Sequence, residues 1–191
     1  VLETVLKPRY FFADDFRQFH DYFLSMPHIE RSFHKGDSNL MKFQTAEHTG
    51  GTIRPAQKED LSVIARIWLE ANIQAHSFIP SSYWQDHLPM VEELLPQAEV
   101  FVYETLEGIQ GFLGMNGDYI EGIFIRQEAR SRGIGKTLIN CAKSQKHKLR
   151  LSVYRNNTEA VKFYQREGFQ IEKEGIDPDT GQAEYSMIWE F

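Results

Sequence analysis

Hydrophobic and polar positions along residues 52–191 follow two periods, one typical of helices and one typical of strands. Apolar residues recur at helical spacing in four segments, which predicts helices over residues 59–73, 83–95, 134–142 and 157–165. Short apolar runs between turn-forming residues predict a short strand that begins at Thr52. They predict six further strands, over residues 100–103, 109–115, 119–125, 149–154, 169–174 and 184–189. Helices and strands alternate from residue 119 to residue 174, whereas two helices and then two further strands precede that stretch.

One predicted helix contains a proline. Pro89 lies inside the segment 83–95 and has no backbone N–H to donate to the preceding turn. The sequence therefore predicts either a kink at this point or two short helices.

The first fifty residues have a different pattern. Aromatic side chains crowd the segment from Tyr10 to Phe43, and so short a piece of chain cannot bury them by itself. A polar, glycine-containing stretch follows at residues 45–51. We predict a boundary near Gly50, with residues 1–50 an extension of unknown role and residues 51–191 the main domain.

Residues 123–139 have the pattern of a strand, a basic glycine loop and a helix. Gly133 and Gly135 allow the backbone to approach a ligand closely, and Arg130, Arg132 and Lys136 add positive charge. The N–H groups of such a loop point to the same place as the positive end of the helix dipole. This arrangement is typical of a phosphate-binding site, whereas a surface turn with solvated arginines is the simpler alternative.

The spacing of the glycines shows which known kind of phosphate loop this segment matches. A nucleoside-triphosphate loop needs a glycine where Arg130 stands, and a dinucleotide loop needs one where Leu138 stands. The pattern that fits is Arg-x-x-Gly-x-Gly, at Arg130, Gly133 and Gly135. It resembles the acetyl-coenzyme A pyrophosphate loop of the GCN5-related N-acetyltransferase (GNAT) superfamily.

A second motif lies downstream of this loop, after a predicted helix and strand. Residues 157–169 match Asn-x-x-Ala-x-x-Phe-Tyr-x-x-x-Gly-Phe, which resembles the other conserved motif of GNAT enzymes. The two motifs stand in the family's order, and the resemblance extends over about residues 52–191. It includes similarity to small, single-domain bacterial members, some of which acetylate protein lysines.

The resemblance implies a fold and a place for the cofactor. It implies an α+β fold, an α/β/α sandwich around a mixed, mostly antiparallel twisted sheet of about six to seven strands. That sheet is splayed between its fourth and fifth strands, here 119–125 and 149–154. The pantetheine arm would lie in the gap.

The resemblance also implies which residues contact acetyl-coenzyme A. Backbone groups of the fourth strand would pair with the pantetheine arm, the loop N–H groups would bind the pyrophosphate, and Asn157 would hold the arm or the adjacent loop. The implied contacts are Ile123, Phe124, Ile125, Arg130, Ser131, Arg132, Gly133, Ile134, Gly135, Lys136, Asn157 and Tyr164. After the fourth strand the family often has Asp-Pro and an aromatic residue, whereas this chain has Arg126-Gln127 and Ala129.

Acyl transfer from a thioester to an amine needs a neutral amine and a protonated leaving thiolate. Tyr164 is the predicted proton donor, and a packed helix aromatic is the alternative. Glu121, next to the acyl site, is the candidate base through a water molecule, and a solvated strand carboxylate is equally compatible with the sequence. His76 and Tyr83 are candidate groups for binding the acceptor.

Composition narrows the partners and the location. The chain has 191 residues, a formal net charge of −6 and a pI near 5.7, which does not favour binding to nucleic acid. The single cysteine, Cys141, fits a reducing compartment. There is no run of roughly 20 apolar residues and no signal-peptide pattern, so a cytoplasmic protein that does not engage a membrane is expected. Histidine spacings do not indicate a metal site.

We therefore predict an N-acetyltransferase that transfers the acetyl group of acetyl-coenzyme A directly to a primary amine, without a metal. The acceptor would be a protein lysine or N-terminus, or a small-molecule amine. A non-catalytic acyl-coenzyme A sensor and a toxin that acetylates aminoacyl-transfer RNA are the alternatives. A homodimer is compatible with this prediction.

Overall fold

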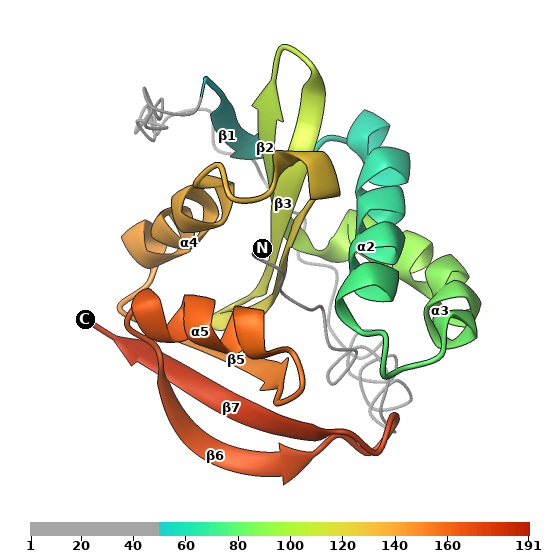
Figure 1. The fold of residues 1–191 in the computed structure, drawn as a ribbon. Coiled ribbons are helices and arrows are strands. Elements are labelled where there is room, and N and C mark those ends of the chain that lie inside the picture. Colours follow the sequence, from blue (N-terminus) through green and yellow to red (C-terminus); the bar gives the residue numbers. More distant parts are fainter. Residues whose placement is uncertain (1–49) are drawn as a thin grey trace, which may run out of the picture. The chain divides into compact units, whose positions relative to one another are not determined.

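A computed structural model of the chain describes residues 50–191 (Figure 1). The predicted aromatic extension, apart from Gly50, lies outside the described residues. The helices are α2 (Leu61–Ala75), α3 (Ser81–Leu94), α4 (Ile134–Gln145) and α5 (Thr158–Arg166), with short 3-10 turns η1 (Lys58–Asp60), η2 (Leu95–Gln97) and η3 (Gln127–Ala129). The strands are β1 (Thr52–Pro55), β2 (Glu99–Thr105), β3 (Gly108–Asn116), β4 (Tyr119–Ile125), β5 (Lys148–Tyr154), β6 (Gln170–Ile176) and β7 (Ala183–Glu190).

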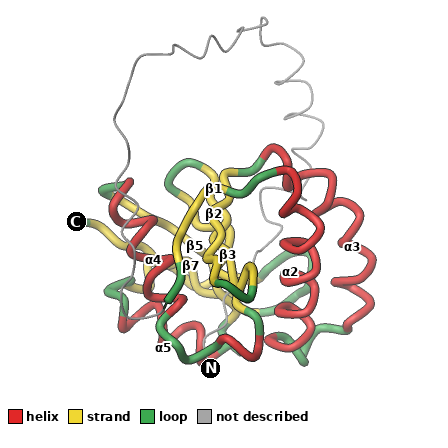
Figure 2. Tube along the Cα trace, turned by 90° about the horizontal axis from the view of Figure 1, so that it is seen from above, coloured by secondary structure: helices red, strands yellow, loops and turns green. Residues whose placement is uncertain are grey.

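The seven strands form one mixed sheet in the order β1-β2-β3-β4-β5-β7-β6. Every neighbouring pair is antiparallel except β4 and β5, which run parallel. The sheet lies between two helical layers, with α2 and α3 on one side and α4 and α5 on the other (Figures 1 and 2). The predicted α+β sandwich is confirmed.

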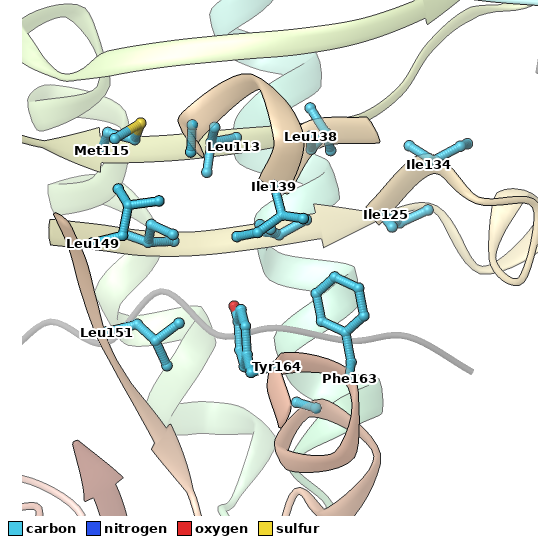
Figure 3. Packing of buried hydrophobic residues seen from close by; sticks show 14 of the residues in the cluster. Leu113, Met115, Ile125, Ile134, Leu138, Ile139, Leu149, Leu151, Phe163 and Tyr164 are labelled. Atoms are coloured by element: carbon cyan, nitrogen blue, oxygen red, sulfur yellow. The ribbon is translucent and has the colours of Figure 1, made fainter. Parts of the chain in front are cut away.

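The parallel strands β4 and β5 meet at one end only. Their single ladder contact joins Tyr119 to Arg150. That end is also held by the Arg150 N–H, which donates to the carbonyl of Asp118 over 2.9 Å, and by the Asp118–Arg150 ion pair. From there the strands diverge, as Figure 3 shows, so the predicted splay between the fourth and fifth strands is confirmed.

A β-bulge in β4 accompanies the splay. Met115 of β3 pairs with Ile120 and Gly114 pairs with Gly122, so no β3 residue stands opposite Glu121. A bulge bends the strand and increases its twist. The bulge begins just after Tyr119, so the irregularity of β4 lies where the pairing with β5 ends.

Apolar side chains fill the face of the sheet under α4 and α5. Leu138 and Ile139 of α4 pack with Leu113 of β3, and Phe163 of α5 belongs to the same cluster of buried side chains (Figure 3). On the other face, α2 buries Ile64, Ile67, Trp68 and Ala71. Buried apolar side chains therefore hold a helical layer against each face of the sheet.

Helix α3 continues unbroken through Pro89, so the two-helix alternative is wrong. The missing hydrogen bond would have gone to the carbonyl of Gln85, and both residues lie on the exposed side of the helix. Water can therefore take the place of the proline N–H. None of the helices between residues 50 and 191 is long and apolar enough to span a membrane.

Candidate active site

The glycine loop joins the open end of β4 to α4. After Ile125 the chain makes the short turn η3, and α4 begins at Ile134. Two residues between them adopt left-handed backbone conformations, Ser131 with φ 61° and Gly133 with φ 82°. Ser131, Arg132 and Gly133 are exposed, so this turn is accessible from solvent.

The N-terminus of α4 has no side-chain cap. Gly133 occupies the N-cap position and makes no side-chain hydrogen bond to the helix. The first backbone hydrogen bond of the helix runs from the Thr137 N–H to the Gly133 carbonyl, over 3.1 Å. The N–H groups of Ile134, Gly135 and Lys136 precede it and have no acceptor within the helix. Together with the helix dipole they form a site suited to an anion.

Arg130 braces this loop. Its Nε donates to the Ile125 carbonyl over 3.2 Å, and its Nη2 donates to Oε1 of Gln74 on α2 over 2.7 Å. The side chain thus ties the loop to the end of β4 and to the helix on the opposite face of the sheet. Positive charge near the exposed turn comes from Arg132 and Lys136, both of which are exposed.

Replacement of Gly133 by valine should weaken binding of acetyl-coenzyme A about ten- to hundredfold. A β-branched residue is strained at φ 82°, and the shift that relieves the strain would displace the N–H groups that are suited to an anion. Gly117→Val is the matched control, because Gly117 has φ 62° in the turn between β3 and β4, at the closed end of the splay. Calorimetry should find similar losses of thermal stability and a loss of affinity only for Gly133→Val. Equal affinities in both variants would remove the pyrophosphate assignment from this loop.

The edge of β4 that faces the splay is arranged to pair with an extended ligand. The Arg126 N–H donates to the Gln110 carbonyl of β3 over 2.9 Å. Because backbone groups alternate in direction along a strand, Ile123 and Ile125 direct theirs away from β3, toward the gap. In the described part of the chain, β5 reaches this edge only at Tyr119.

Helix α5 carries Tyr164 into the gap. The Asn157 side chain caps the helix by accepting a hydrogen bond from the Ala160 N–H over 3.2 Å. Tyr164 is fully buried and packs edge-on against Phe169. Figure 3 shows Tyr164 between the diverging strands, with its hydroxyl pointing toward β4. The loop thus follows the carboxyl end of β4, Asn157 follows β5 at the start of α5, and Tyr164 lies in the gap between the two strands.

Glu121 is a buried carboxyl group at the bulge of β4. Only 2% of its surface is exposed, and neither carboxyl oxygen has a hydrogen-bond partner among the described residues. Burial raises the pKa of Glu121 to about 8. A carboxyl group with a pKa near neutrality can accept a proton at physiological pH, which is the chemistry expected of a general base.

The two residues predicted to bind the acceptor lie in different environments. His76 ends α2 and is 1% exposed, and its Nε2 lies 3.3 Å from Nδ2 of Asn157. Tyr83, on α3, is half-buried. Burial, and then the negative charges of Asp179 and Asp177, raise the pKa of Tyr83. Tyr83 therefore lies on the side of the site where the turn between β6 and β7 contributes carboxylates.

The sequence analysis also missed the buried polar pair of Tyr154 and Asp177. The Tyr154 hydroxyl, at the end of β5, donates to Oδ2 of Asp177 over 2.6 Å. Oδ1 of Asp177 accepts from the N–H groups of Asp179 and Thr180, which holds the β6–β7 turn in shape. The only sequence signal was the turn-forming stretch 177–181, which carries no information about Tyr154.

A family model described as acetyltransferase (GNAT) domain matches residues 96–171, which include both motifs. The peptidyl-lysine N-acetyltransferase YiaC of Escherichia coli K12 is 34% identical over 139 residues, or 72% of this chain and 95% of YiaC. The peptidyl-lysine N-acetyltransferase YjaB of Salmonella typhimurium is 29% identical over 131 residues, or 68% of this chain and 90% of YjaB.

Solved structures match the fold. The solution structure of apo YjaB from Escherichia coli superposes with a TM-score of 0.66 at 24% identity, covering 73% of this chain and 97% of YjaB. Spermidine N-acetyltransferase from Vibrio cholerae, solved with CoA and spermine, superposes with a TM-score of 0.58 at 24% identity, covering 74% of this chain and 95% of that one.

Proposed function

This chain belongs to the GNAT superfamily and is an N-acetyltransferase that uses acetyl-coenzyme A, and on that premise we propose that its acceptor is a lysine side chain of a protein. We also propose that Tyr164 and Glu121 move the protons of the reaction. The observation that carries the second proposal is the position of Tyr164 in the gap between β4 and β5 (Figure 3).

The donor side follows from the loop and the strand edge. Bound acetyl-coenzyme A supplies the activated thioester. The N–H groups at the start of α4 would hold its pyrophosphate, while backbone groups of Ile123 and Ile125 would hold the amides of its arm. Both sets of contacts use the backbone, so the side chains of Arg126 and Ala129, which differ from the family pattern, do not affect them.

Two residues would handle the protons. Glu121, deprotonated, accepts a proton from the acceptor ammonium group through a water molecule, which leaves a neutral amine nitrogen to attack the carbonyl carbon. Tyr164 donates its hydroxyl proton to the sulfur as the carbon–sulfur bond breaks, and the second proton that the nitrogen loses as the amide forms restores the tyrosine hydroxyl. Burial of both side chains supports this assignment, because protein groups then control the protons in place of bulk water.

Two observations support a lysine acceptor. The relatives YiaC and YjaB are both named peptidyl-lysine N-acetyltransferases. In addition, the negative charges of Asp179 and Asp177 contribute to the raised pKa of Tyr83. This side of the site is therefore negatively charged, which favours a cationic side chain.

An acceptor panel with the full chain tests this proposal. Release of free thiol from acetyl-coenzyme A is followed with lysine-containing peptides, the same peptides with arginine in place of lysine, spermidine and aminoacyl-transfer RNA. We expect thiol release with the lysine peptides and none with their arginine counterparts. Turnover with spermidine or charged transfer RNA alone would contradict a protein-lysine acceptor.

A further inference from the structure

His76 and Asn157 connect two elements that lie far apart in the sequence. His76 ends α2, whereas Asn157 lies 81 residues later at the start of α5. Both side chains are buried, with exposed fractions of 1% and 6%. The contact between them joins a helix on one face of the sheet to the helix that carries Tyr164.

The directions of the hydrogen bonds define the chemical state of His76. Oδ1 of Asn157 accepts from the Ala160 N–H, so the amide nitrogen Nδ2 is the atom that faces His76. An amide nitrogen only donates, and Nε2 of His76 must therefore accept. A ring nitrogen that accepts carries no proton, so His76 is the neutral tautomer protonated at Nδ1.

Packing fixes the orientation of the His76 ring. Rings of Phe78, Trp84 and Tyr154 surround it, with centroids 5.5, 5.3 and 5.3 Å away. Tyr154 is itself held by its hydrogen bond to Asp177. The ring therefore cannot turn its Nε2 away from Asn157 without disturbing three aromatic neighbours.

The helix transmits this contact to the reaction site. Asn157, Ala160 and Tyr164 follow one another at intervals of three and four residues, so they lie along one side of α5. A shift of the Asn157 cap therefore changes the position of the Tyr164 hydroxyl. Displacements of about 1 Å in a catalytic group can lower rates about a hundredfold.

We propose that His76 is a positioning residue for Tyr164, acting through Asn157 from the opposite face of the sheet, and not an acceptor-binding residue. This inference rests on the proposed function for its kinetic consequence, since Tyr164 is the proposed proton donor. The bond itself is a property of the folded protein and can be measured without turnover.

Two substitutions of His76 separate the hydrogen bond from the packing. His76→Gln places an amide oxygen near the position of Nε2, so the acceptor is kept. His76→Phe keeps the ring and removes the acceptor. We expect kcat within about threefold of the wild type for His76→Gln and about ten- to hundredfold lower for His76→Phe, with the KM for the acceptor unchanged in both. A rise in acceptor KM with kcat unchanged would make His76 an acceptor-binding residue and overturn the proposal.

A double substitution tests whether His76 acts through Tyr164. In the Tyr164→Phe background the proton donor is already absent, so His76→Phe should lower the remaining rate by less than twofold. A full loss on top of Tyr164→Phe would show that His76 acts independently of Tyr164, which contradicts the proposal.

The tautomer provides a test that needs no acceptor. In full-length protein with ¹⁵N-labelled histidine, the His76 resonances are assigned by their absence in His76→Gln. We expect protonation at Nδ1 in the wild type and at Nε2 in Asn157→Asp, where a carboxylate oxygen replaces the amide donor. Protonation at Nε2 in the wild type would show that Nε2 does not accept a hydrogen bond from Asn157, which would contradict the proposal. If the acceptor panel fails but the tautomer is as expected, the proposed function is wrong and the His76–Asn157 bond stands.

Discussion

Tyr164→Phe is expected to lower turnover by about a hundredfold or more while leaving the affinity for acetyl-coenzyme A within a few fold of the wild type. The substitution removes the hydroxyl that points toward β4 and keeps the aromatic ring (Figure 3). The ring is fully buried against Phe169, so the helix keeps its packing. Thiol release measures turnover, and calorimetric titration measures cofactor binding.

A second buried tyrosine serves as the control. Tyr103 is also fully buried, but it lies on β2, with β3 and β4 between it and the splay. Tyr103→Phe should keep full turnover. If Tyr164→Phe also keeps full turnover, another group protonates the leaving sulfur and Tyr164 has only a packing role.

Glu121→Gln should remove a pH-dependent step from the reaction. Burial raises the pKa of Glu121 to about 8, and the deprotonated form is the one that can accept a proton. In the wild type kcat/KM should therefore rise with pH and level off above about pH 8. In Glu121→Gln that rise should disappear, and kcat/KM above pH 8 should be about a hundredfold lower.

The acceptor amine also loses a proton at alkaline pH, but that step belongs to the substrate and should persist in Glu121→Gln. The control variant is Glu107→Gln, an exposed carboxylate in the turn between β2 and β3, which should keep the wild-type pH profile. A wild-type profile for Glu121→Gln would mean that Glu121 is not the base.

Deprotonation of Glu121 should also lower the stability of the folded protein, although it raises kcat/KM. The unfolded chain releases the Glu121 proton near its ordinary pKa of 4.5, whereas the folded chain holds the proton up to about pH 8. Because the folded state then binds more protons, its stability should fall as pH rises between these values. Glutamine has no proton to lose, so Glu121→Gln should be more stable than the wild type above pH 8 in thermal unfolding.

Much of the local structure could be predicted from sequence because its causes are local. The helical spacing of apolar residues predicted α2, α4 and α5. Gly133 at a left-handed position follows from the backbone requirements of a tight turn. The cap that Asn157 makes for α5 was not predicted, because residues 157–165 were assigned to the helix as a whole. The order of the two motifs was enough to identify the superfamily.

The effect of Pro89 on α3 could not be predicted from the local sequence. A proline removes one hydrogen bond from a helix, but whether the helix breaks depends on what surrounds the unpaired carbonyl. Here that carbonyl faces the exposed side of α3, and the helix continues. Burial is set by packing between elements, so no pattern within 83–95 could decide between the two outcomes.

The sequence by itself determined the elements, the glycine loop and the presence of Tyr164 in its motif. Only the tertiary structure decided that Glu121 is buried at a bulge, that Arg130 braces the loop to Gln74, and that His76 bonds to Asn157. The two contacts join residues 56 and 81 positions apart, and the pKa of Glu121 depends on its desolvation in the packed protein. Such contacts leave no periodic trace in the chain, because they arise only when the sheet and both helical layers have packed.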